Sequence, residues 1–339
     1  EQGLAAATEY GEAFPIAYQD DYQPRAAVAD IRKMANLVSD NDVAMSFYRS
    51  LGDNDQTARF RLFHLNAPLP LSDVMPILEN LGLRVIAERS YGIKRKCGTQ
   101  IWIHEFVLFY GWAQGIEINE VKGNFQEAFA RIWYGDAEND AFNKLVLGTG
   151  LGWRDVAMLR SYARYLKQIQ FSFSNEYIAD TLLRHLTITQ ILVQLFNVRF
   201  DPKFSGSDDE RTERENKLEV RIIAALDAVE NLSEDRIIRQ YVALLRATVR
   251  CNYFQRDDSG KAKNYFSFKL DSQQIPDLPL PRPMYEIFVY SPRVEGVHLR
   301  TSRVARGGLR WSDRQEDYRT EVLGLVKAQN VKNAVIVPT

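Results

Sequence analysis

The stretch on which the interpretation of this sequence rests is Thr301-Ser302-Arg303-Val304-Ala305-Arg306-Gly307-Gly308-Leu309-Arg310-Trp311-Ser312-Asp313-Arg314. It places four arginines and a Gly-Gly pair between a strand-like run at 295–300 and a helix-like run at 316–330. Adjacent glycines allow a ligand to approach the backbone closely, and arginines supply forked donors for carboxylate or phosphate. We interpret the stretch as a loop that binds an anionic substrate, with a basic surface loop as the alternative.

The helix-like run adds two polar residues, Gln329 and Lys332, which are three positions apart and share a face if the helix reaches them. Together with Arg306 they would give one pocket two cations and an amide. That combination suits a dicarboxylate or the α-carboxylate of an amino acid. The alternative is that Lys327 and Lys332 merely favour the negative end of the helix dipole.

The composition is ordinary for a soluble globular protein. The 339 residues are 45% hydrophobic and 26% charged, and 43 Lys and Arg against 44 Asp and Glu leave a net charge of -1. This balance does not favour a nucleic-acid or membrane-surface partner, and no apolar run approaches the roughly 18 residues of a membrane span. Cys97 and Cys251 form neither a disulfide framework nor metal spacing, so a reducing cytoplasm is expected.

Other catalytic signatures are missing from the sequence. The four histidines have no metal-ligand spacing, and His64 and His104 lie in apolar strand-like runs, where satisfied core histidines are expected. There is no G-x-G-x-x-G fingerprint and no Walker loop, so no nucleotide domain is expected within these residues. The chain has no initiator Met and ends on an apolar strand-like run, 333–339, which leads us to expect a piece of a longer polypeptide.

Hydrophobic periodicity divides the chain into four parts. Residues 1–56 are read as a connector with a helix at 25–38 and a strand at 43–49. Residues 57–137 follow the order strand, helix, strand, strand, helix, which is typical of a small α+β sandwich with helices on one face. Such a module either binds amino acids between copies or serves as a spacer, and both readings stay open.

Residues 138–258 have helical periodicity almost throughout, with helices expected at 153–169, 175–196, 210–229 and 234–254. A last domain begins at residue 259 and is unfinished at 339. It contains strands at 265–270 and 285–290, the Arg/Gly loop and the helix that follows.

These residues resemble a known family. Arg303 to Arg314, followed by Asp317-Tyr318-Arg319-Thr320-Glu321-Val322-Leu323-Gly324-Leu325-Val326-Lys327-Ala328-Gln329-Asn330-Val331-Lys332, is similar to the start of the catalytic region of the large-subunit NAD-dependent glutamate dehydrogenases. Pro68 to Val74 and Glu79 to Ile86 look like the ACT-like regulatory module of that family, and the helical stretch fits the segment between the two. The resemblance covers most of the chain and is strongest from about residue 285.

The resemblance implies roles for individual residues. In the smaller hexameric glutamate dehydrogenases the matching loop reads Lys-Gly-Gly, and its lysine contacts a substrate carboxylate. Here Arg306 takes that position, followed by Gly307 and Gly308, so a point donor becomes a fork. The family's helix-end Gln and Lys fall on Gln329 and Lys332. Its catalytic lysine, in a Gly-x-Lys-Gly-Gly run, is expected just after Thr339, and its NAD-binding domain further on.

The resulting hypothesis is a multidomain α+β/α/β fold: an ACT-like module, a helical middle region and the first part of a glutamate-dehydrogenase-type α/β substrate domain. The whole enzyme would interconvert L-glutamate and 2-oxoglutarate with NAD, as a cytoplasmic homo-oligomer with an amino acid as candidate effector. No metal is expected, and this piece alone is expected to be inactive. Two alternatives stay open: a sensing or oligomerisation region without catalysis, and a dehydrogenase for another acidic amino acid.

Overall fold

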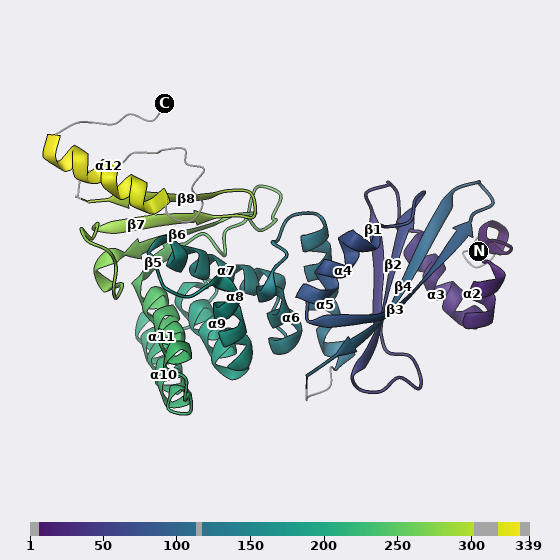
Figure 1. The fold of residues 1–339 in the computed structure, drawn as a ribbon, viewed down its shortest axis with the longest axis horizontal. Coiled ribbons are helices and arrows are strands. Elements are labelled where there is room, and N and C mark those ends of the chain that lie inside the picture. The colour runs from purple at the N-terminus through teal and green to yellow at the C-terminus, as the bar shows by residue number, and fades with distance from the viewer. Residues whose placement is uncertain (1–6, 113–116, 302–317, 333–339) are drawn as a thin grey trace. The chain divides into compact units, whose positions relative to one another are not determined.

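The computed structural model describes residues 7–112, 117–301 and 318–332; the side chains of 329–332 are excepted. The chain forms two compact units, residues 1–134 and 135–339 (Figure 1). Each unit is described by itself below. None of the described helices is both long and apolar enough to cross a bilayer.

The N-terminal unit is built on a four-stranded antiparallel sheet in the order β1-β2-β4-β3. Its strands are Val43–Tyr48 (β1), Thr57–Leu65 (β2), Leu83–Lys94 (β3) and Gln100–Tyr110 (β4). β1 is the edge strand of this sheet, although the sequence places the module boundary at residue 57. Side chains on both faces of β2 and β4 are buried, so the sheet requires cover on both sides.

One face of this sheet is covered by α4 (Leu71–Asn80) and α5 (Ile118–Trp133). Phe125 of α5 stacks on Phe47 with ring centroids 4.1 Å apart, and both Phe125 and Phe129 meet Phe60 at ring edges. The expected order of strand, helix, strand, strand and helix is confirmed.

The expectation of helices on one face only is wrong. In Figure 1 two helices from the predicted connector, α2 (Ile16–Asp21) and α3 (Pro24–Met34), lie on the side of the sheet opposite α4 and α5. Tyr18 and Met34 are buried there in one cluster with Phe63 and Ile103. The physical reason is the second apolar face of β2 and β4, which would otherwise be exposed to water.

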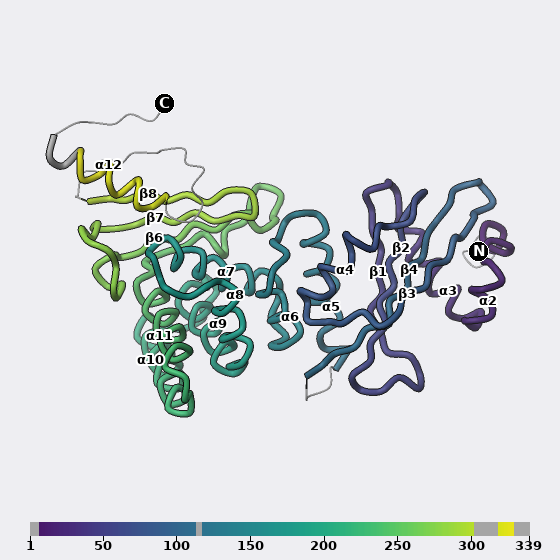
Figure 2. Tube along the Cα trace, in the orientation of Figure 1, coloured from purple at the N-terminus to yellow at the C-terminus, as the bar shows by residue number. Residues whose placement is uncertain are grey.

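The C-terminal unit begins with helices (Figure 2). They are η1 (Ala141–Asn143), α6 (Lys144–Thr149), α7 (Trp153–Gln168), α8 (Asn175–Arg184), α9 (Leu186–Phe200), α10 (Asp208–Leu226) and α11 (Leu232–Ala247). The single helix expected at 175–196 is interrupted at His185, whose backbone is not helical and whose Nε2 lies 2.6 Å from Glu234 Oε2. The helix expected to reach residue 254 ends at Ala247.

The helices lead into a second four-stranded antiparallel sheet in the order β5-β6-β7-β8. Its elements are β5 (Thr248–Cys251), β6 (Phe266–Asp271), η2 (Ser272–Gln274), β7 (Tyr285–Tyr290), β8 (Glu295–Arg300) and the later helix α12 (Tyr318–Lys332). The β-branched Thr248 and Val249 favour the strand that replaces the expected helix end. All strands described in this unit pair antiparallel, so the sheet itself is not of the parallel kind that an α/β domain implies.

The helical region and the second sheet share one core, although the sequence places a domain boundary between them at residue 258. Tyr162 and Tyr165 of α7 contact the rings of Phe268 and Phe288, with centroids 4.8 and 5.5 Å apart. The hydroxyl of Tyr162 is also within 2.8 Å of Thr248 Oγ1. These aromatic side chains bury the face of the sheet on which α12 also packs.

Candidate functional site

The predicted substrate residues fall into two groups in the structure. Arg306, Gly307 and Gly308 lie within 302–317, outside the described residues. Gln329 and Lys332 lie in the last turns of α12, which extends through both positions; their side chains are also outside the described part. The structure therefore gives the frame that carries these residues, and their contact with substrate stays a prediction.

The first turn of α12 is fixed by a buried ion pair. Arg319 donates from Nε to Glu286 Oε2 of β7 at 2.8 Å and from Nη2 to Glu286 Oε1. The two side chains are 1% and 0% exposed. Glu286 also accepts a hydrogen bond from the Tyr165 hydroxyl at 2.9 Å, and the Arg319 backbone N–H donates to Gln168 Oε1 at 3.2 Å. A buried pair satisfied in this way fixes both the position and the rotation of the helix start.

The rest of the described part of α12 is held by apolar contacts. Val322, Leu323 and Val326 are buried against Val297 and Leu299 of β8. The spacing of these positions turns one stripe of the helix toward the sheet, as expected for an amphipathic surface helix. The helix that ends at Gln329 and Lys332 is therefore fixed to β7 and β8 at its start and along its length.

A titratable carboxyl lies where β8 begins, close to the start of α12. The side chain of Glu295 is 20% exposed, and Arg164 Nε lies 3.6 Å from its Oε1. Burial raises the pKa of Glu295 to about 7, although the Arg164 guanidinium opposes the shift. Burial is also the main reason why the pKa of Tyr318 is raised, and the negative charge of Glu295 adds to it.

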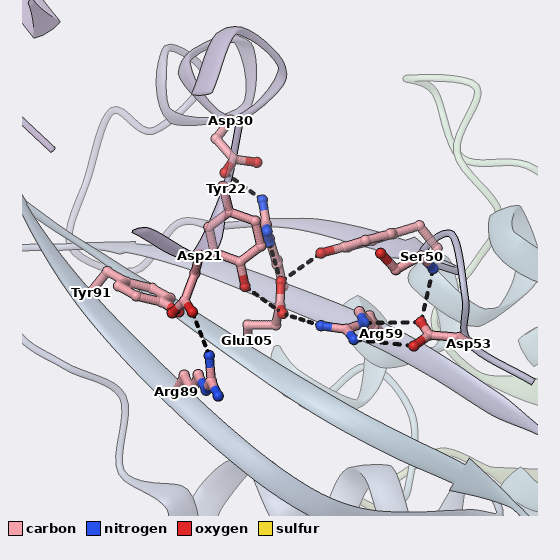
Figure 3. A network of polar contacts seen from close by, with 11 residues as sticks. Asp21, Tyr22, Asp30, Ser50, Asp53, Arg59, Arg89, Tyr91 and Glu105 are labelled. Carbon is pink, nitrogen blue, oxygen red and sulfur yellow. Dashed lines mark hydrogen bonds and ion pairs between the residues drawn. The ribbon is translucent and has the colours of Figure 1, made fainter. Parts of the chain in front are cut away.

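A second buried polar network lies in the N-terminal unit, on the face covered by α2 and α3 (Figure 3). Arg61 of β2 donates from Nε to Glu105 Oε2 of β4 at 2.5 Å and from Nη1 to Asp30 Oδ2 of α3 at 2.6 Å. The hydroxyls of Tyr22 and Tyr48 donate to the two oxygens of Glu105 at 2.6 and 2.5 Å. The Arg61 guanidinium also lies 4.1 Å from the centroid of the Tyr22 ring.

The two carboxyl groups of this network are held in different electrostatic surroundings. Burial opposes ionisation of Glu105, but Arg61 and the two tyrosine hydroxyls outweigh it and hold its pKa below the ordinary value. For Asp30 burial dominates and raises the pKa, with Arg61 and the Tyr18 hydroxyl only partly offsetting it.

Sequence analysis singled out none of the residues in this network. The available signal was a charged residue inside each of two apolar strands, because buried charges in proteins are paired. Arg61 and Glu105 stand directly opposite each other in the β2–β4 register. That register is set by the pairing of whole strands and cannot be read from either segment alone.

The histidines behave as structural side chains. His104 is buried, accepts a hydrogen bond at Nε2 from the Leu69 backbone N–H at 3.1 Å, and places Nδ1 2.9 Å from Glu88 Oε1. The expectation of a satisfied core histidine is therefore confirmed for His104. His64 is less buried, and its Nδ1 contacts the Ala67 carbonyl at 2.8 Å. No group of three or more His, Cys, Asp or Glu in the described ranges is arranged to hold a metal ion.

Replacing Arg319 by Met should strongly destabilise the C-terminal unit. The change leaves Glu286 buried without its cation, which costs about 3–5 kcal/mol of unfolding free energy. Adding Glu286→Leu should recover most of this loss, because an apolar pair needs no compensation for desolvation. Urea denaturation measures both variants, with Lys327→Met, at an exposed position of α12, as the control. A loss no larger than that of the control would show that the pair does not hold the helix.

Glu295 should make the C-terminal unit less stable as the pH rises. Its pKa in the folded state, about 7, lies above the ordinary 4.5, so its favourable contribution is complete below pH 4.5 and is lost as the pH rises through 7. Glu295→Gln should therefore raise the unfolding free energy at pH 8 by about 2 kcal/mol while changing little at pH 4.5. Urea denaturation at both pH values tests this, with the exposed Glu230→Gln as control. An equal effect of Glu295→Gln at both pH values would contradict it.

Comparison with known proteins places the whole chain in one context. Four family models match successive regions: glutamate dehydrogenase, helical motif 2 (residues 1–37); glutamate dehydrogenase, ACT3 domain (42–121); glutamate dehydrogenase, helical motif 3 (137–202); and bacterial NAD-glutamate dehydrogenase, catalytic domain (221–339). The last model includes the predicted substrate residues and the anchored helix α12.

The chain is also similar along nearly all of its length to proteins named NAD-specific glutamate dehydrogenase. It is 51% identical to the protein of Halomonas elongata over 98% of the chain, 50% to that of Pseudomonas aeruginosa over 99%, and 43% to that of Mycobacterium tuberculosis over 99%. The matched regions are 20%, 21% and 21% of those proteins, so the chain spans about a fifth of their length. The chain therefore belongs to the family of the large NAD-dependent glutamate dehydrogenases.

Proposed function

We propose that this chain is part of an enzyme that converts L-glutamate to 2-oxoglutarate and ammonium with NAD, or catalyses the reverse reaction. The observation that carries the proposal is the placement of the predicted substrate residues. Arg306-Gly307-Gly308 lies in the connection between β8 and α12, and Gln329 and Lys332 end the helix that the buried Arg319–Glu286 pair anchors. A pocket built on this frame would have a fixed wall.

Each of these residues has a physical role in the proposal. Arg306 offers two parallel donors to a carboxylate, and the glycines after it let the backbone approach the substrate. Gln329 and Lys332 bind the amino-acid end of the substrate. Each charge-assisted hydrogen bond contributes roughly 1.5–3 kcal/mol, which is enough for the group to be measured singly.

The described residues do not themselves fit a dinucleotide. A doubly wound NAD site requires parallel strands and a glycine-rich turn before a helix. The strands of the described ranges pair antiparallel, and the sequence has no G-x-G-x-x-G run. The proposal therefore assigns NAD to a domain outside this sequence, and the catalytic lysine to residues that follow Thr339.

The parts before the substrate domain have a different role in this proposal. The N-terminal unit, with its ACT-like sheet, regulates the whole enzyme through an amino acid effector, and the helical region links it to the substrate domain. We further propose a homo-oligomer in the cytoplasm. The free state of both cysteines agrees with a reducing compartment.

Removal of a predicted substrate contact should weaken substrate binding in the full-length enzyme. Arg306→Ala and Lys332→Ala should each raise the KM for glutamate by about 10- to 100-fold, because each loses one charge-assisted contact. Steady-state kinetics at saturating NAD measures this. Lys327→Ala is the matched control, since Lys327 is an exposed lysine of the same helix.

Two results would decide against the assignment. An unchanged KM in Arg306→Ala would remove that residue from the site. A wild-type enzyme that oxidises another acidic amino acid in place of glutamate would leave the pocket in place and change its substrate.

A further inference from the structure

A pocket of about 390 Å³ opens beside the buried network of the N-terminal unit. It is bounded by α3 and the segment before it, by β1 and the loop after it, and by Arg61 of β2. This volume is large enough for a small metabolite. The Arg61 and Asp30 side chains are each 5% exposed, and both line the pocket.

Both buried groups keep hydrogen-bonding capacity. An arginine has five N–H donors, and the described contacts of Arg61 use Nε and Nη1 for Glu105 and Asp30. The hydrogen bonds to Asp30, from Arg61 and from the Tyr18 hydroxyl, both end on Oδ2, which leaves Oδ1 as an acceptor. Figure 3 shows one oxygen of Asp30 with a dashed contact and the other without one.

The local charges restrict the kind of ligand. Two guanidinium groups, Arg59 and Arg61, stand among three carboxylates, Asp30, Asp53 and Glu105. A simple anion would bring a further negative charge to a cluster in which carboxylates already outnumber cations, and a simple cation would be repelled by Arg61. A ligand with both charges on neighbouring atoms can satisfy the Arg61 donor and the Asp30 acceptor together.

We propose that this pocket binds an L-α-amino acid, with its carboxylate on Arg61 and its ammonium group on Asp30. The ligand would complete hydrogen bonds that the buried pair leaves open, and the side chain would extend toward the mouth, where Arg25 and Gln23 line the pocket. The inference deepens the regulatory role proposed for the N-terminal unit, and binding is measured independently of glutamate oxidation.

The test is calorimetric titration of the full-length protein with individual L-amino acids other than glutamate. At least one should bind saturably, and its deaminated analogue should bind about tenfold more weakly or not at all. Ala29→Trp fills the pocket from an exposed position of its wall, and should raise the Kd about tenfold or more. Val28→Trp, at an exposed position of α3 that does not line the pocket, is the matched control and should leave the Kd unchanged.

Asp30→Asn is the second variant, because it keeps the size of the side chain and removes the charge that the ammonium group requires; its Kd should rise likewise. Thermal melting followed by circular dichroism checks that each variant is folded. Absence of saturable binding, or equal binding by Ala29→Trp and Val28→Trp, would overturn the proposal. Failure of the wild-type protein to oxidise glutamate would count against the catalytic proposal alone, since binding at this pocket is scored separately.

Discussion

The buried pair of Arg319 and Glu286 is the contact on which the predicted substrate frame depends. Removing two charges from water costs several kcal/mol per ion, and this cost is recovered only when geometry and further hydrogen bonds are good. Here the carboxylate receives two donors from Arg319 and one from Tyr165. Because so specific a set of partners exists in one arrangement only, a small rotation of α12 would leave a charge buried without its partner.

The N-terminal unit uses the same principle with a different outcome. Arg61 also links a strand to a helix, through Glu105 and Asp30, and it too is nearly inaccessible to water. The Arg319 pair lies beneath an apolar contact between helix and sheet, whereas the Arg61 pair borders a pocket. One buried arginine therefore fixes a helix, while the other holds a helix in place and still faces a space that a ligand can enter.

Local patterns predicted much of the fold and little of the packing. Alternating and helical periodicity gave the strand and helix order of residues 57–133, because burial of one face imposes that period. The interruption at His185 and the strand Thr248–Cys251 were missed, since both depend on partners distant in the sequence, Glu234 and β6. The second covered face of the first sheet was missed for the same reason: α2 and α3 have no strong period of their own until the apolar side of β2 is known.

The predicted site shows a similar division between local and distant information. Arg306, Gln329 and Lys332 could be proposed from a short stretch, because charge and spacing along one helix are local properties. The residues that fix this helix could not, since Glu286 and Tyr165 come from a strand and a helix 33 and 154 residues away from Arg319. A fork donor such as Arg306 discriminates by angle as well as by charge, and it can do so only against a wall that does not rotate. Substrate selectivity at this position thus depends on the buried pair, although neither of its members needs to contact substrate.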